Sequence, residues 1–127
     1  MNRVTKLLAL LAGLSLLISV SACVYDQVVP QQPDVGTVSF SNDIIPIFNS
    51  SCNVTGCHNG TQVPDLRPAN AYNSLTAGGY VNTGNPEASE LYQWMSGNRG
   101  LPMPPGGSNN TYNAYVLAWI QQGALDN

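Results

Sequence analysis

The stretch C-N-V-T-G-C-H runs from Cys52 to His58 and holds two of the three cysteines of this 127-residue chain, together with its only histidine. Two thiols and one imidazole are therefore confined to one short segment. Four residues separate the cysteines, and Asn53, Thr55 and Gly56 among them are turn-prone residues that can bulge without backbone strain. The stretch is expected to form a loop that carries the chemistry of the chain.

A pair of cysteines followed at once by a histidine is the attachment pattern of covalent haem, whose usual form has two residues between the cysteines. In such a segment two thiols, here those of Cys52 and Cys57, add across the two vinyl groups of the macrocycle. The adjacent histidine, here His58, then reaches the iron. The longer spacing in this chain is permissible but less diagnostic, so the pattern alone predicts a haem site with moderate specificity.

Composition limits the chain to one small domain. Only 9% of the residues are charged, and the 12 glycines and 9 prolines indicate a loop-rich fold with few, short helices. A domain of about 100 residues or fewer often needs a disulfide, a metal or a cofactor to supplement a thin core. A covalent haem would be such a supplement.

The N-terminus has the pattern of a bacterial lipoprotein signal peptide, assigned to residues 1–22. Two basic residues precede an apolar run at positions 7–20, which is too short to span a bilayer as a helix. The segment V-S-A-C at 20–23 resembles the lipobox, in which the cysteine is acylated and becomes the first residue of the mature protein. This resemblance implies that Cys23 is a lipid anchor on the bacterial cell envelope, facing the periplasm or the cell exterior.

Residues 23–38 are predicted to form a semi-extended tether, because they contain two prolines and lack helical periodicity. The folded domain is then assigned to residues 39–127. From Cys23 onward the chain has two arginines and seven carboxylates, which leaves a net charge of −5. This charge disfavours nucleic acid and favours a partner with a positive patch, although ordinary solubility explains it equally well.

Apolar residues at helical spacing predict a first helix that begins near Asn42 or Asp43 and ends just before Cys52. Pro46 lacks a backbone N–H and fits only within the first turn, which fixes the predicted start. The helix places Phe48 one turn ahead of the first cysteine of the pair.

Further helices are predicted in the C-terminal half of the chain. A short one is expected at residues 68–75, and a stronger one begins after Asn85 and carries Met95 near its end. The clearest helix is capped by Ser108 or Asn109, and Gly123 ends it, after a long set of apolar residues at helical spacing.

The loop before the last helix reads G-L-P-M-P-P-G-G at positions 100–107. Its prolines exclude helix and hold Met103 away from its neighbours, so the thioether is expected to project in a fixed direction.

Together these features resemble small class I cytochromes c, and more narrowly the haem-binding domains of bacterial lipoproteins with a helix, a C-x4-C-H site and an M-P-P-G-G loop. The resemblance covers residues 40–125. It implies an all-α, cytochrome c-like fold of three to four short helices with long loops around one covalent haem c. The haem would be attached through Cys52 and Cys57, with His58 as the proximal iron ligand.

The resemblance also implies a sixth iron ligand in the loop before the last helix, where Met103 is the residue that matches. Met95 is the rival, although its place on an apolar helix face favours a role in the core. In the family, aromatic residues of the first and last helices lie near the haem, and Phe48 and Trp119 stand at those positions. Ile44 replaces a glycine that small cytochromes have at the helix crossing.

Less specific signals concern four other residues. Arg67 or Arg99 is a candidate partner for a haem propionate, although an exposed arginine is more often solvated. Tyr72 and Tyr80 are candidates for the wall of a haem crevice.

Three other interpretations remain open. Cys52 and Cys57 could form a disulfide that staples a surface lipoprotein binding module without a cofactor, but His58 and Met103 would then be unexplained. A zinc site needs four ligands, and the stretch offers at most three. An enzyme acting on oxygen or peroxide is disfavoured, because a methionine-ligated iron is closed to substrate and the chain has no second histidine.

The sequence therefore predicts a membrane-anchored monohaem c-type cytochrome that carries electrons between redox partner proteins. Docking of these partners is expected to be weak and transient, because turnover requires release. Neither a small-molecule substrate nor nucleic acid is expected as a partner, and the protein is not expected to be an enzyme.

Overall fold

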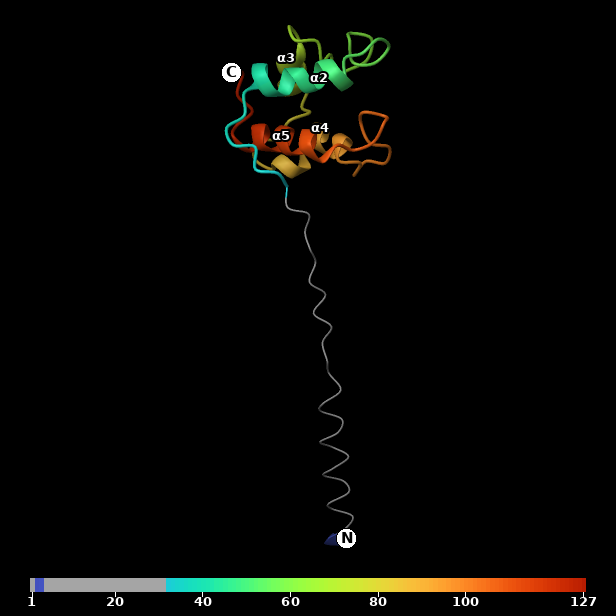
Figure 1. Ribbon diagram of the computed structural model, residues 1–127, viewed down its shortest axis with the longest axis vertical. Helices are drawn as coiled ribbons and strands as arrows, with labels where there is room; N and C mark the ends of the chain where they lie inside the picture. Colours follow the sequence, from blue (N-terminus) through green and yellow to red (C-terminus); the bar gives the residue numbers. More distant parts are fainter. Residues whose placement is uncertain (1, 4–31) are drawn as a thin grey trace. The chain divides into compact units, whose positions relative to one another are not determined.

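The computed structural model describes residues 2–3 and 32–127 (Figure 1). The chain divides into two units at Gln31 and Gln32, and the second unit is described here. Most of the predicted signal peptide, the anchor Cys23 and the first part of the predicted tether lie outside the described residues. Among the described residues, no helix is both long enough and apolar enough to cross a membrane.

Within residues 32–127 the regular secondary structure is helical, and this part of the chain contains no strand, in agreement with the predicted all-α class. Long loops join short helices, as the glycine and proline content predicts. The elements in chain order are the π-helix η1 (Phe40–Ile44), α2 (Ile45–Ser51), α3 (Ala71–Thr76), the 3-10 helix η2 (Pro86–Ala88), α4 (Glu90–Met95) and α5 (Asn110–Gln121).

The first helical segment begins at Phe40, earlier than the predicted start near Asn42 or Asp43. Ser39 caps it, because its hydroxyl accepts a hydrogen bond from the backbone N–H of Asn42 at 3.2 Å. The opening turn is a wide π turn, which places Pro46 in the first turn of the following α2 and leaves room for its ring. The prediction that the helix runs up to Cys52 is confirmed. The predicted start is wrong, because the helical segment begins at Phe40 with a π-helical turn.

The predicted helix after Asn85 is broken into η2 and α4 at Ser89. The backbone of Ser89 is extended, with φ −57° and ψ 130°, and its buried hydroxyl accepts a hydrogen bond from the N–H of Asn82 at 2.9 Å. Two residues later, the N–H of Leu91 donates to the carbonyl of Tyr80 at 3.0 Å instead of to a helical carbonyl. These contacts between distant residues interrupt the helix that the local pattern predicts.

The structure confirms the predicted last helix, α5, together with its N-terminal cap at Asn109 and its end at Gly123. The side chain of Asn109 accepts a hydrogen bond from the N–H of Tyr112 at 3.0 Å, and Gly123 follows the helix with a φ of +100°. The predicted apolar face, which includes Val116 and Trp119, is buried.

Aromatic side chains join α5 to the first helical segment in the core. The ring of Phe40 lies 5.0 Å from the ring of Trp119 and 6.4 Å from that of Phe48, measured between centroids. Both predicted aromatic residues, Phe48 and Trp119, are fully buried, and the Trp119 indole N–H donates to the carbonyl of Leu125 at 2.9 Å. Phe40 therefore packs the first helical segment against α5, the pair of helices that are in contact according to the cytochrome resemblance.

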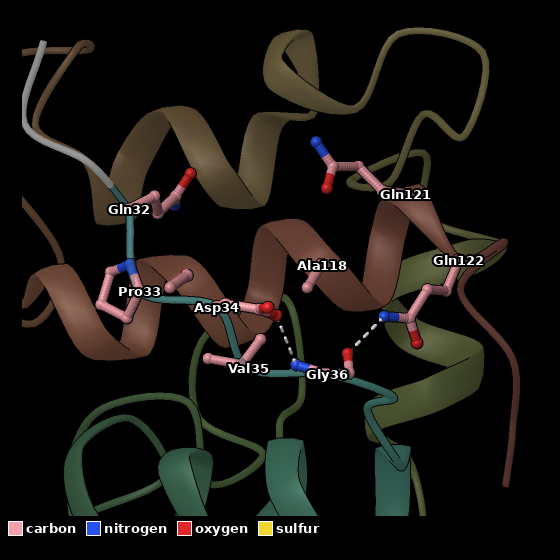
Figure 2. Close-up of a pocket in the computed structure, with 9 residues that line it drawn as sticks. Gln32, Pro33, Asp34, Val35, Gly36, Ala118, Gln121 and Gln122 are labelled. Atoms are coloured by element: carbon pink, nitrogen blue, oxygen red, sulfur yellow. Dashed lines mark hydrogen bonds between the residues drawn. The ribbon is translucent and has the colours of Figure 1, made fainter.

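The segment that enters the folded unit lies along α5 (Figure 2). The Gln122 amide donates to the carbonyl of Gly36 at 2.8 Å and accepts from the N–H of Val38 at 2.9 Å. Asp34 in turn accepts from the N–H of Gly36 at 3.0 Å. A pocket of about 280 Å³ lies between this segment and α5, and none of the predicted site residues lines it.

Candidate functional site

A second cavity, of about 410 Å³, gathers all four residues predicted to hold a haem. Cys52, Cys57 and His58 reach it from the loop after α2, and Met103 reaches it from the loop between α4 and α5. Figure 1 shows these two loops, in green and orange, projecting from the same side of the folded unit. A cavity of this volume lies within the range of small-molecule and cofactor sites.

The wall of the cavity is mainly apolar, as is usual for a buried cofactor site. It combines aliphatic and aromatic side chains from the two loops, from α4 and from the segment between α3 and η2 with a single carboxylate. Besides the four predicted residues, the main wall residues are Val63, Pro64, Leu66, Tyr80, Glu90, Leu91, Trp94, Met95, Pro104 and Pro105.

The four residues between the cysteines fold as a compact turn, as predicted. The N–H of Cys57 donates to the carbonyl of Val54 at 2.9 Å, and the N–H of His58 returns to the carbonyl of Cys52 at 3.1 Å. Gly56 has a φ of +84°, in the left-handed region that glycine adopts without strain. The longer spacing is thus accommodated by a turn that keeps both thiols and the imidazole at one cavity.

The two cysteines differ in exposure. Cys52 is buried, Cys57 is half-buried, and both are free thiols in the structure. Burial raises the pKa of the Cys52 thiol to about 11, and the neighbouring Cys57 adds to this effect. Both cysteines line the same cavity.

His58 is held in one orientation by the segment that follows the cysteine stretch. Its Nδ1 atom lies 2.9 Å from the carbonyl oxygen of Pro64, and the N–H of Leu66 donates to the His58 carbonyl at 2.8 Å. Since a carbonyl oxygen only accepts, Nδ1 carries a proton, and in the neutral imidazole this leaves the lone pair on Nε2. No described residue forms a hydrogen bond with Nε2. Histidines that ligate metals are commonly held in this way.

Two methionines line the cavity in different settings. Met103 is 38% exposed, and its backbone N–H is fixed by a hydrogen bond of 3.0 Å to the carbonyl of Trp94. Met95 is only 3% exposed and belongs to the hydrophobic core. The packing of Met95 agrees with the role of core filler that its helical position favours.

Only one of the two tyrosines suggested for the crevice lines the cavity. Tyr80 is part of its wall. Tyr72 packs against Phe40 instead, and its hydroxyl donates to the carbonyl of Ala124 at 3.1 Å.

Both arginines of the folded unit pair with carboxylates. Arg99 lies 3.2 Å from Glu90, whose carboxylate also accepts from the indole N–H of Trp94 at 3.3 Å at the cavity wall. Arg67 lies 2.6 Å from Asp65. Hydrogen bonds from Arg67 hold the pKa of the Asp65 carboxyl well below its usual range. Neither arginine lines the cavity.

Within residues 2–3 and 32–127, no three His, Cys, Asp or Glu side chains gather in an arrangement that could hold a metal ion by themselves. A zinc site takes its ligands from protein side chains. Haem differs, because the macrocycle supplies most of the iron ligands and the protein supplies only axial ones.

No protein-family model, curated protein or solved structure matches this chain. The function must therefore be argued from the geometry and chemistry of the site.

Several wall residues of the cavity carry no sequence signal of their own. Leu91 and Trp94 come from a helix whose pattern predicts core packing, and Pro64 comes from an irregular loop.

Proposed function

We propose that residues 32–127 form a haem domain that transfers single electrons between partner proteins, as the module of a monohaem c-type cytochrome. The observation that carries this proposal is the state of His58. Its Nδ1 proton is committed to the Pro64 carbonyl, and its Nε2 lone pair is available in an apolar cavity that also bears two thiols and a thioether.

The residues present fit a covalently attached haem c. Cys52 and Cys57 would form the two thioether links, His58 would be the proximal ligand and Met103 the sixth ligand. The bound haem iron would supply one-electron chemistry between its ferric and ferrous states. The chain contributes a nitrogen donor of fixed orientation, a soft sulfur donor and an apolar wall that excludes water.

The character of these donors favours the reduced state. A thioether sulfur is a soft ligand, and an apolar wall disfavours the extra charge of the oxidised centre. The hydrogen bond from the Met103 N–H to the Trp94 carbonyl fixes the backbone that presents the thioether. A module whose donors stay in place during turnover suits electron transfer better than the binding and conversion of a substrate.

The proposed setting of this module is the bacterial cell envelope. Cys23 would be acylated and hold the domain to a membrane, while the tether would keep it within reach of redox partners. Docking would be weak and transient because each cycle requires release.

Haem staining on a denaturing gel tests the proposal. Covalent haem should remain with the protein, and the stain should be lost or strongly reduced in Cys57→Ser. The matched control is Cys23→Ser, which removes the third cysteine and should keep the stain. A folded mature protein without stain, with Cys52 and Cys57 joined in a disulfide, would instead support the stapled binding module.

A further inference from the structure

The tripeptide from Pro64 to Leu66 touches His58 at two points. The Pro64 carbonyl accepts from the imidazole, and the Leu66 N–H donates to the His58 carbonyl. The Leu66 carbonyl in turn accepts from the Asn53 side chain at 3.2 Å. The orientation of the imidazole therefore depends on where this tripeptide is held.

Asp65, the middle residue, is turned toward a different set of partners. Its carboxylate accepts from the Nε and Nη2 atoms of Arg67 at 2.9 and 2.6 Å, from the Arg67 backbone N–H at 3.1 Å and from the Asn70 amide at 2.7 Å. Its own N–H donates to the hydroxyl of Ser74, in α3, at 2.8 Å. Asp65 thus connects the loop that holds His58 to α3 and to the turn that precedes it.

This hydrogen-bond network around Asp65 is expected to contribute little to the free energy of unfolding. The Arg67 side chain is 52% exposed and that of Asp65 is 21% exposed, and exposed ion pairs contribute little to stability. The geometry of the network is nevertheless specific, because one carboxylate accepts from two side chains and one backbone N–H. Its share in the free energy of unfolding is therefore small, and its main effect falls on the backbone between Pro64 and Leu66.

We propose that Asp65 is a positioning residue for His58, which fixes the Pro64 carbonyl and thereby keeps the imidazole proton on Nδ1. The role in iron ligation rests on the proposed haem function, whereas the effect on the imidazole does not. Asp65 does not touch His58 and acts through the backbone of Pro64. The hydrogen bond that it maintains also makes Nε2 a stronger donor to a metal.

The test uses the full chain, labelled with ¹⁵N in its only histidine, so that the imidazole gives a single set of NMR signals. The measured quantity is the rate at which the His58 Nδ1 proton exchanges with solvent. In Asp65→Ala we expect exchange to accelerate by about tenfold or more, because the contact with the Pro64 carbonyl opens more often once the loop is released. Asp126→Asn is the charge control, because Asp126 is exposed and none of the described residues bonds to its carboxylate.

A second variant keeps the proposal testable if Asp65→Ala fails to fold. Arg67→Gln leaves Asp65 in place but removes the paired guanidinium, and it should accelerate exchange by a smaller factor. Asp65→Asn, which keeps an acceptor oxygen, should restore part of the protection. Exchange in Asp65→Ala or Arg67→Gln that stays within twofold of the wild-type rate would overturn the proposal.

Failure of the positioning role of Asp65 can be distinguished from failure of the haem proposal. A chain without haem that still shows a protected Nδ1 proton, lost in Asp65→Ala, would support positioning and contradict the haem function. A chain with covalent haem whose Nδ1 proton exchanges equally in all variants would overturn positioning alone. In a haem-containing chain, Asp65→Ala should also raise the reduction potential more than Asp126→Asn does, because a weaker imidazole donor stabilises ferric iron less.

Discussion

The Nδ1 atom of His58 lies 2.9 Å from the carbonyl oxygen of Pro64, six residues further along the chain. This contact determines which imidazole nitrogen carries the proton and which is left for a ligand. It also ties the cysteine stretch to the loop that forms one side of the cavity.

The two methionines should respond differently to removal of the side chain. Met103→Ala should abolish the weak near-infrared absorption band of a thioether bound to ferric haem, and Met95→Ala should keep it. Because Met95 is fully buried, its truncation should lower the free energy of unfolding by about 2 to 5 kcal/mol. Urea unfolding and absorption spectra of both variants measure this, and loss of the band in Met95→Ala alone would reassign the ligand.

In the haem-free protein, the thiols of Cys52 and Cys57 should differ in their reactivity toward alkylating agents. The thiolate is the reactive form, and the pKa of about 11 for Cys52 keeps it protonated at neutral pH. Cys57 is also more exposed. Reduced, haem-free protein treated with iodoacetamide at neutral pH should be alkylated at Cys57 at least about tenfold faster than at Cys52. Peptide mass spectrometry measures both rates, and equal rates would be inconsistent with a buried Cys52.

Acid should weaken the contribution of Asp65 to stability. Its pKa is depressed in the folded state, so this contribution is complete above the usual carboxyl range and is lost as pH falls through the folded pKa. The difference in unfolding free energy between wild type and Asp65→Asn should therefore be constant from pH 7 to about 5 and shrink below about pH 4. Urea titrations at several pH values measure it. A difference that grows on acidification would contradict the assigned pairing with Arg67.

The cap of α5 offers a test of the fold that is independent of haem. Asn109→Ala removes the acceptor for the Tyr112 N–H and should cost about 1 kcal/mol of stability. Asn110→Ala, at the next position and exposed, should change stability by less than about 0.5 kcal/mol. Thermal unfolding of both variants gives the comparison, and equal losses would argue against the cap.

Membrane attachment is proposed to depend on Cys23, which lies outside the described residues. Cys23→Ser should release the protein into the soluble fraction, because a single acylated residue is the proposed anchor. Fractionation and metabolic labelling with a fatty acid measure this. Continued acylation of the variant would contradict the lipobox assignment.

The structure agrees with the sequence where the signals are local. The α5 cap at Asn109, its end at Gly123 and the turn at Gly56 each depend on residues close together in the chain. The gathering of the cysteine stretch and Met103 at one cavity is what the resemblance to small cytochromes c implies.

The differences arise from contacts between distant residues. The break at Ser89 depends on Asn82 and Tyr80, which no periodicity in α4 reveals. The earlier start of the first helical segment follows from the cap at Ser39 and from the packing of Phe40 on Trp119. The hold of Pro64 on His58 has no sequence pattern either, since a backbone carbonyl acts as the acceptor.

Covalent attachment of haem is tested by the intact mass of the mature protein, measured under denaturing conditions. We expect the mass of the acylated chain plus one haem, with the haem mass retained in Met103→Ala and in Asp65→Ala. The haem mass should be absent when Cys52 and Cys57 are both replaced by serine. A folded wild-type protein with the mass of the acylated polypeptide alone would contradict the account.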